Sequence, residues 1–172
     1  MNLNTRPIEK LELSRFEPPK IQGEPNCLIK SIWYLVNAII FQSSIPALLP
    51  SSAKAAILRA FGARVGRGVV VKPRVTIKAP WFLEMGTHVW LGERVWIDNH
   101  TTVRLGSNVF VSQGVYLFTG NHDWSDPRFR FFCRPVEVGN GAWITAFQMI
   151  GPGTVVPPHV VVLPDTAKGE MT

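Results

Sequence analysis

The stretch MGTHVWLGERVWIDNHTTVRLGSNVFVSQGVYLFT, residues 85–119, decides the fold. Read in blocks of six, it places an apolar residue first in every block, namely Met85, Leu91, Ile97, Val103, Val109 and Val115. A period of six matches neither the 3.6 of a helix nor the simple alternation of a hairpin strand. It predicts short strands separated by corners, with three units in each triangular coil and the leading side chains buried between stacked coils.

The same phase extends over ten blocks, from Phe61 to Thr119, and returns between Val138 and Val162. We expect about three coils in the first run and about one and a half in the second. Fifth positions such as Val89, Val95, Thr101, Ser107 and Gln113 should then lie near the interior corners. A β-sandwich also has alternating strands, but it would not hold one phase for ten blocks. The sequence therefore predicts an all-β parallel β-helix.

The segments before the repeat predict an arm and two helices. Residues 1–27 are polar and broken by prolines, and they do not form a signal peptide. Residues 28–50 predict a packed amphipathic helix that ends before Pro46, because the apolar run is too interrupted to span a membrane. A membrane-surface anchor is the alternative, given the neighbouring Trp33 and Tyr34.

A second helix should cover the open end of the first coil. Ser51 and Ser52 can cap it, and Gly62 is a suitable stop. We therefore divide the chain into an arm with helices (1–60), a β-helix (61–167) and a tail (168–172).

Composition limits the classes of partner. The net charge is +6 with no recognisable nucleic-acid module, so the basic residues suit a solvated surface, phosphate groups or anionic lipid better than nucleic acid. The two cysteines have no paired spacing, which favours a reducing compartment such as the cytoplasm.

The segment GNHDWSDPRFRFFCRPVE, residues 120–137, breaks the six-residue phase and predicts a projecting loop. Long loops on regular scaffolds commonly carry function. Trp124 and Phe129 could offer a platform to a sugar ring, although aromatic side chains could equally serve to pack the loop against the protein.

His122 stands where the repeat gives way to this loop, and a neutral imidazole there could accept a proton. Asp123 or a nearby carbonyl could fix its tautomer. We expect His88, His100 and His159 to be ordinary surface residues, and the spacing of the histidines predicts no metal site. From these residues alone, a catalytic and an inert His122 remain equally open.

Five segments are similar to the hexapeptide-repeat, left-handed β-helix acetyltransferases, and most closely to the colanic-acid-biosynthesis type of sugar O-acetyltransferase. They are LRAFGARVGRGVVVKP (58–73), APWFLEMGTHVWLGERVWIDN (79–99), VFVSQGVYLFTGNHDWSDPRF (109–129), PVEVGNGAWITAF (135–147) and IGPGTVV (150–156). The TGNHDWSDPRF stretch is more specific than the repeat itself.

This resemblance implies transfer of an acetyl group from acetyl-CoA to a hydroxyl of a sugar, free or linked to a nucleotide or lipid, for a surface polysaccharide. It implies His122 as general base, without a metal, and homotrimers whose sites lie between subunits. Acceptor contacts are expected from Asp98, Asn99, Asp123 and Trp124. The coenzyme A groove is expected along Trp143, Thr145, Ala146 and Gly151.

The final segment, VVVLPDTAKGEMT, departs from the family pattern, which usually continues through further hexapeptides. Because those coils help to hold coenzyme A, the alternative is a non-catalytic β-helix trimer that binds the cofactor poorly. A metal-dependent hydratase on the same fold would require bound zinc.

Overall fold

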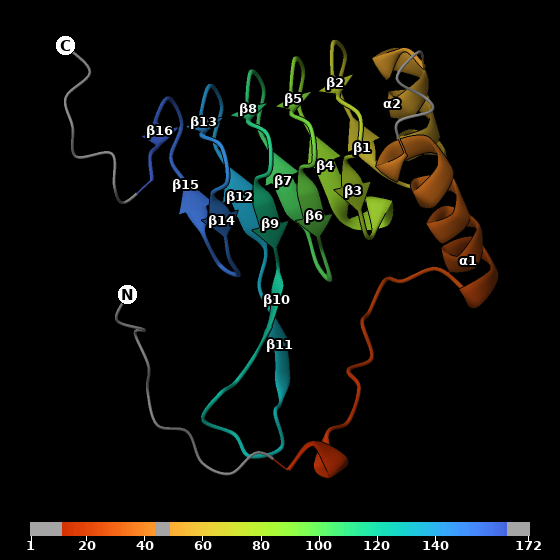
Figure 1. Cartoon of the computed structure of the whole chain (residues 1–172), viewed down its shortest axis with the longest axis vertical. Coiled ribbons are helices and arrows are strands. Elements are labelled where there is room, and N and C mark those ends of the chain that lie inside the picture. The colour runs from red at the N-terminus through yellow and green to blue at the C-terminus, as the bar shows by residue number, and fades with distance from the viewer. Residues whose placement is uncertain (1–11, 44–48, 165–172) are drawn as a thin grey trace.

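The computed structural model describes residues 12–43 and 49–164, and it forms a parallel β-helix with helices at its N-terminal end (Figure 1). Three parallel sheets make the sides of the coil. The first contains β1 (Arg64–Val65), β4 (Leu83–Met85), β7 (Val103–Leu105), β12 (Val136–Val138) and β15 (Val155–Val156). The second contains β2 (Val70–Val71), β5 (Trp90–Leu91), β8 (Phe110–Val111), β13 (Trp143–Ile144) and β16 (Val161–Val162). The third contains β3 (Thr76–Ile77), β6 (Trp96–Asp98), β9 (Tyr116–Phe118) and β14 (Met149–Ile150). The predicted fold class is therefore confirmed.

The core is a column of aliphatic side chains along the axis of the coils. The leading residues from Met85 to Val115 are all buried, as the repeat predicts. The fifth-position prediction fails in the third coil, where Ser107 is half-buried and Gln113 is exposed. The core there uses Leu105 and Val111 instead.

The failure has a geometric cause, because each early coil is longer than three blocks of six. Met85 pairs with Leu105, and Ile97 pairs with Leu117, so each partner lies two positions beyond the one that three blocks would give. The two additional residues lie at the corner that follows the third sheet. Side chains alternate across a strand with a period of two, so an insertion of two leaves the leading positions buried while it moves the corners. Later coils are shorter, since Val138 pairs with Val156, which leads the third block after it.

One corner of every coil requires a left-handed backbone. Gly68, His88, Asn108 and Gly141 occupy it in successive coils with φ between +56° and +68°. Glycine adopts this conformation freely, and asparagine and histidine are enriched there among other residues. His88 is thus a corner residue of the scaffold.

Two helical segments cover the first coil. The chain passes from a short 3₁₀ turn, η1 (Leu13–Arg15), to α1 (Cys27–Val36) and continues as a π-helical segment, η2 (Asn37–Gln42). Trp33 is fully buried, and its indole Nε1 donates to the carbonyls of Ile77 and Lys78, both at 3.0 Å. The packing role expected for this helix is confirmed, and the helical segment ends at Gln42, before Pro46 as expected.

The second helix, α2 (Ser51–Ala60), begins after Pro50, and neither serine caps it. The Ser51 hydroxyl instead accepts a hydrogen bond from the amide of Val71 and ties the helix to the first coil. This corrects the predicted cap.

The outward face of α1 and η2 is apolar and exposed. It consists of Leu28, Ile32, Leu35 and Ile39, which we call the outer stripe. Among the described residues, no helix has both the length and the apolar character needed to cross a bilayer.

Two flat faces of the prism carry aromatic ladders. Along the second sheet Trp90 meets Phe110 edge-on and Phe110 contacts Trp143 at a tilt, and along the third sheet Trp96 stacks on Tyr116. Trp90 and Trp96 are exposed. Trp81 lies in the turn η4 (Pro80–Phe82) and packs against the core.

Candidate active site

The segment predicted as a loop leaves the coil after Thr119 and forms a β-hairpin that projects from the prism (Figure 1). Its strands are β10 (Gly120–His122) and β11 (Phe131–Cys133), which pair antiparallel with His122 opposite Phe131. Thr119 is fully buried, and its hydroxyl accepts hydrogen bonds from the amides of His100 and Thr101. The base of the hairpin is therefore fixed to the preceding coil.

The imidazole of His122 is held by a backbone carbonyl. Nδ1 lies 2.7 Å from the carbonyl oxygen of Phe129. A carbonyl only accepts, so Nδ1 carries the proton and Nε2 of the neutral ring keeps its lone pair. Phe129 has φ of +56°, a strained conformation for an aromatic residue. Its carbonyl and its ring both face His122, with ring centroids 3.8 Å apart and nearly parallel.

Two further aromatic rings surround this histidine. Phe131 approaches edge-on at 5.3 Å, and Phe16 of the N-terminal arm approaches at 5.4 Å. The arm is also tied to the hairpin by a hydrogen bond from the amide of Glu12 to the carbonyl of Pro127. The imidazole is thus half-buried among aromatic rings, and its orientation is fixed.

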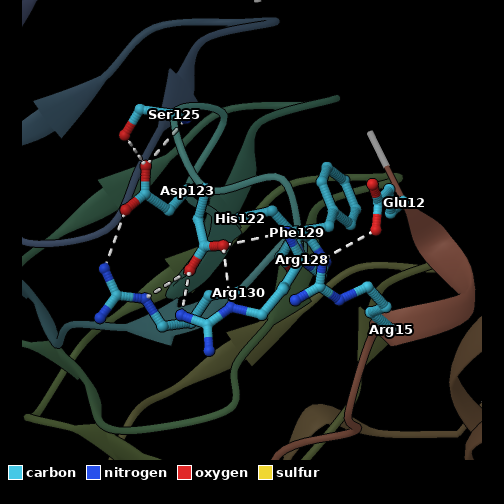
Figure 2. A network of polar contacts seen from close by, with 9 residues as sticks. Glu12, Arg15, His122, Asp123, Ser125, Arg128, Phe129 and Arg130 are labelled. Atoms are coloured by element: carbon cyan, nitrogen blue, oxygen red, sulfur yellow. Dashed lines mark hydrogen bonds and ion pairs between the residues drawn. The ribbon is translucent and has the colours of Figure 1, made fainter. Parts of the chain in front are cut away.

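Asp123 does not orient His122, although it is the next residue. Its carboxylate accepts hydrogen bonds from Ser125 and Arg130, as Figure 2 shows. The hydrogen bond from the Ser125 hydroxyl, followed by that from Arg130, lowers the pKa of Asp123 to about 2. Of the two tautomer-fixing groups anticipated from the sequence, the carbonyl makes the contact and the carboxylate stabilises the tip of the hairpin.

A second polar cluster lies at the corner beneath the hairpin. The Lys78 ammonium is 2.8 Å from a carboxylate oxygen of Asp98 and 2.7 Å from Nε2 of His100. Tyr116 donates to the other oxygen of Asp98 at 2.9 Å. Burial first, and the hydrogen bond to Asp98 second, raise the pKa of Tyr116 to about 12.

The prediction that His100 is an ordinary surface residue is wrong. Its ring is largely buried and lies 4.8 Å from Phe131, whose other neighbour is His122. Burial, and then the positive charge of Lys78, lower the pKa of His100. The ring is therefore neutral around pH 7. No sequence motif distinguishes it from His88, and only its place at the lengthened corner brings it to the hairpin.

Asn99 lies inside the prism and not on the surface where an acceptor could reach it. Its side chain is fully buried, its Oδ1 accepts from the amide of Ala79 at 3.0 Å, and its Nδ2 donates to the carbonyl of Ala79 at 2.7 Å. Both ends of the amide are used to hold two coils together, which differs from the acceptor contact that was expected. Trp124, by contrast, is exposed on the hairpin.

The residues expected to bind coenzyme A are divided between two edges. Trp143 is on the second sheet and donates to Ser112, and Thr145 and Ala146 follow at the next corner, where the Thr145 hydroxyl donates to the carbonyl of Val162. Gly151 follows β14 and packs near the ring of Phe118, at the edge from which the hairpin departs. Only Gly151 of this set therefore lies on the same edge as His122.

Within the described residues no group of three metal-ligating side chains is present. Cys27 and Cys133 are both free thiols.

Comparison with known proteins relates the chain to acetyltransferases. No family model matches the sequence. Two curated relatives, each named as the colanic acid biosynthesis acetyltransferase WcaF, come from Escherichia coli K12 and Shigella flexneri. Each is 33% identical over 151 residues, which cover 88% of this chain and 82% of the relative.

Solved structures agree on the fold. A hexapeptide-repeat acetyltransferase of Vibrio cholerae, complexed with acetyl coenzyme A, has a TM-score of 0.58 at 18% identity and covers 78% of this chain and 69% of its own. A maltose O-acetyltransferase of Clostridium difficile 630 has a TM-score of 0.51 at 20% identity, covering 80% of this chain and 75% of its own. By its identity to the curated relatives over most of its length, and by its coiled architecture, this chain belongs to the hexapeptide-repeat acetyltransferases of the colanic acid biosynthesis type.

Proposed function

We propose that this protein transfers an acetyl group from acetyl-CoA to a hydroxyl of a sugar acceptor, with Nε2 of His122 as the general base. The observation that carries the proposal is the contact between Nδ1 and the carbonyl of Phe129, which leaves Nε2 as the basic nitrogen. Nε2 removes the proton as the acceptor oxygen attacks the thioester carbonyl. A backbone amide stabilises the oxyanion, and the protonated imidazole returns the proton to the departing thiolate of coenzyme A.

The acceptor would rest beside the hairpin, where exposed Trp124 offers an apolar face to the sugar ring. Asp123 at the tip of the hairpin, held by Arg130, would accept from a further hydroxyl, whereas the carboxylate of Asp98 is already held by Lys78 and Tyr116. The groove for acetyl-CoA would run along the later coils past Trp143, Thr145, Ala146 and Gly151.

The decisive test is the rate of acetyl transfer in His122→Ala. General-base catalysis typically contributes roughly 10²–10⁴-fold, so we expect kcat to fall by that factor while acetyl-CoA binding is retained. His159→Asn is the matched control, because His159 occupies a left-handed corner of the coil that asparagine tolerates.

A His122→Ala variant that transfers acetyl at the wild-type rate would remove this residue from the mechanism. A wild-type protein whose melting temperature does not respond to acetyl-CoA would instead favour the non-catalytic β-helix, because a ligand of the folded state must stabilise it.

We also propose that the active form is a homotrimer. Exposed aromatic ladders on two flat faces are apolar surfaces of the kind that mark interfaces. Trp143 and His122 also lie on different edges of one prism, so they can share a site only between copies. Light scattering at micromolar concentration should give three times the chain mass, and a monomer mass would refute the shared site.

We place the trimer in the cytoplasm, in contact with a membrane surface. The free thiols suit a reducing compartment. The outer stripe presents four aliphatic side chains on a segment that carries Lys30 and no acidic residue. Such a face can lie in the interface of an anionic bilayer. Sedimentation with anionic vesicles should be lost in Leu35→Glu, and retained binding would exclude this surface.

A further inference from the structure

A pocket of about 500 Å³ lies between the N-terminal arm and the tip of the hairpin. The arm contributes residues 15–20, and the hairpin contributes Arg128, Arg130 and Phe131. These segments are distant in sequence, yet the arm is bonded to the hairpin through Glu12 and packed on it through Phe16. The pocket is thus a built feature of the described chain, separate from the coils.

Its wall is strongly cationic. Arg15, Lys20, Arg128 and Arg130 line it, against a single acid, Glu17. The other carboxylates nearby are already paired with these arginines. Figure 2 shows Glu12 with Arg15 and Asp123 with Arg130. Asp126 pairs with Arg128 and Arg130.

The ion pairs place positive charge outward and negative charge inward. The side chain of Asp126 is only 12% exposed, whereas Arg128 and Arg130 are 62% and 67% exposed. Each guanidinium has five N–H donors in a planar fork, so pairing with Asp126 orients it and still leaves donors for a ligand. The two hydrogen bonds from Arg128, first that of its side chain and then that of its backbone, lower the pKa of Asp126, which keeps this support ionised near neutral pH.

The pocket shares two aromatic rings with the surroundings of His122. Phe16 and Phe131 line the pocket, and both rings also lie against the imidazole. One molecule could therefore place a charged group between the arginines and a hydroxyl near Nε2.

We propose that this pocket binds the phosphate or pyrophosphate group of the acceptor, so that the sugar is acetylated as a phosphorylated or pyrophosphate-linked species. This inference rests on the proposed function of His122. Arginine forks match phosphate oxygens in a bidentate manner. The arginines keep donors beyond those used in their ion pairs, and Lys20 adds a further cation, so the pocket offers several donors to the oxygens of one ligand. The expected coenzyme A residues, 143–151, do not line the pocket.

Binding of inorganic pyrophosphate, measured by isothermal titration calorimetry, tests the pocket without any need for turnover. Losing one charged hydrogen-bond donor costs about 1.5–3 kcal/mol, so Arg128→Gln should weaken pyrophosphate binding by roughly 10- to 100-fold. Arg134→Gln is the matched control. It removes the same charge from the same hairpin, at a side chain that packs over Phe132 outside the pocket. This control should bind pyrophosphate as the wild type does.

Lys20→Gln provides a second variant, because Lys20 lies on the arm and its replacement leaves the ion pairs of Asp123 and Asp126 in place. It should also weaken binding, and circular dichroism should show wild-type folding. Raising the salt concentration should weaken binding in the wild type more than in Arg128→Gln.

Four results would overturn the proposal. The first is no pyrophosphate binding, and the second is an equal loss in Arg134→Gln. The third is displacement of pyrophosphate by coenzyme A, which would assign the pocket to the phosphates of the cofactor. The fourth is tighter binding of glucuronate than of pyrophosphate with the same dependence on Arg128, which would indicate a carboxylate-bearing acceptor. Loss of activity in His122→Ala tests the catalytic role separately, so failure of either idea is visible without the other.

Discussion

The side-chain amide of Asn99 is buried, so we expect it to hold the coils together and not to bind the acceptor. Asn99→Ala tests this expectation. The substitution removes both hydrogen bonds to Ala79, at 3.0 and 2.7 Å, and leaves the Ala79 amide without a partner, whereas the Ala79 carbonyl still accepts from the amide of Phe82 at 3.1 Å. Ala79 is itself buried, so water cannot replace these contacts without opening the coil. An unsatisfied buried donor costs about 1–3 kcal/mol and the second lost hydrogen bond about 0.5–1.5 kcal/mol, so the substitution should cost about 1.5–4.5 kcal/mol.

Thermal unfolding at fixed protein concentration provides the assay. For a chain of this length, 1 kcal/mol shifts Tm by about 2–4 °C, so we expect a decrease of about 3–18 °C. Asn140→Ala is the control, because Asn140 also accepts a backbone hydrogen bond, from Ser107, but lies exposed. It should cost no more than about 0.5–1.5 kcal/mol.

Asn99→Asp should also be destabilised, because a carboxylate accepts from the amide of Ala79 but repels its carbonyl. If Asn99→Ala melts with the wild type and instead raises KM for the acceptor, the reasoning is refuted and Asn99 binds substrate.

Two other expectations concern the hairpin and the helices that cover the first coil. Trp33→Ala should cost about 3–5 kcal/mol, because it empties a buried site over the first coil, while Trp33→Phe should lose only the bonds to Ile77 and Lys78, about 1–3 kcal/mol; equal melting temperatures for the two variants would contradict this. The pKa of Asp123 is lowered from 3.8 to about 2, so its stabilisation of the hairpin is complete above pH 3.8 and is lost as the pH falls through 2. The protection of the hairpin amides from hydrogen exchange, relative to the intrinsic rate at each pH, should therefore fall only in that acidic range. Asp123→Asn should show the lower protection already at neutral pH while keeping the pH dependence of acetyl transfer, since Phe129 and not Asp123 orients His122.

The sequence predicted the coils, their number and the projecting segment, because burial repeats with a regular period and the hairpin interrupts it. The period could not show the coil length, since an insertion of two residues preserves the alternation between inside and outside. The side chains of the adjacent residues Asp98 and Asn99 point in opposite directions, and only the position of the corner decides which of the two is buried. His122 was predicted as the candidate base because it stands at the break in phase.

The contacts that orient the imidazole of His122 could not be predicted from the repeat period or from its interruption. The carbonyl of Phe129 reaches Nδ1 through a left-handed backbone at a residue that rarely adopts it. The arm meets the hairpin across a long separation in sequence, through Phe16 and Glu12, with no periodic pattern on either side. The curated relatives identify the family, and the contact between Nδ1 and the carbonyl of Phe129 identifies the tautomer of His122.

The lengthened coil also makes the scaffold modular. Met85 and Gly86 occupy the same positions in their coil as Leu105 and Gly106 occupy in the next coil. Excision of residues 86–105 would therefore join Met85 to Gly106 across an equivalent corner, and each remaining strand would find a partner of the same kind. Excision of only three blocks of six at that point would keep the alternation between inside and outside, but it would displace every following corner along the strand beneath it. Evolution or an engineer could thus change the distance between the helical cap and the hairpin in whole coils, but only with the local coil length as the unit.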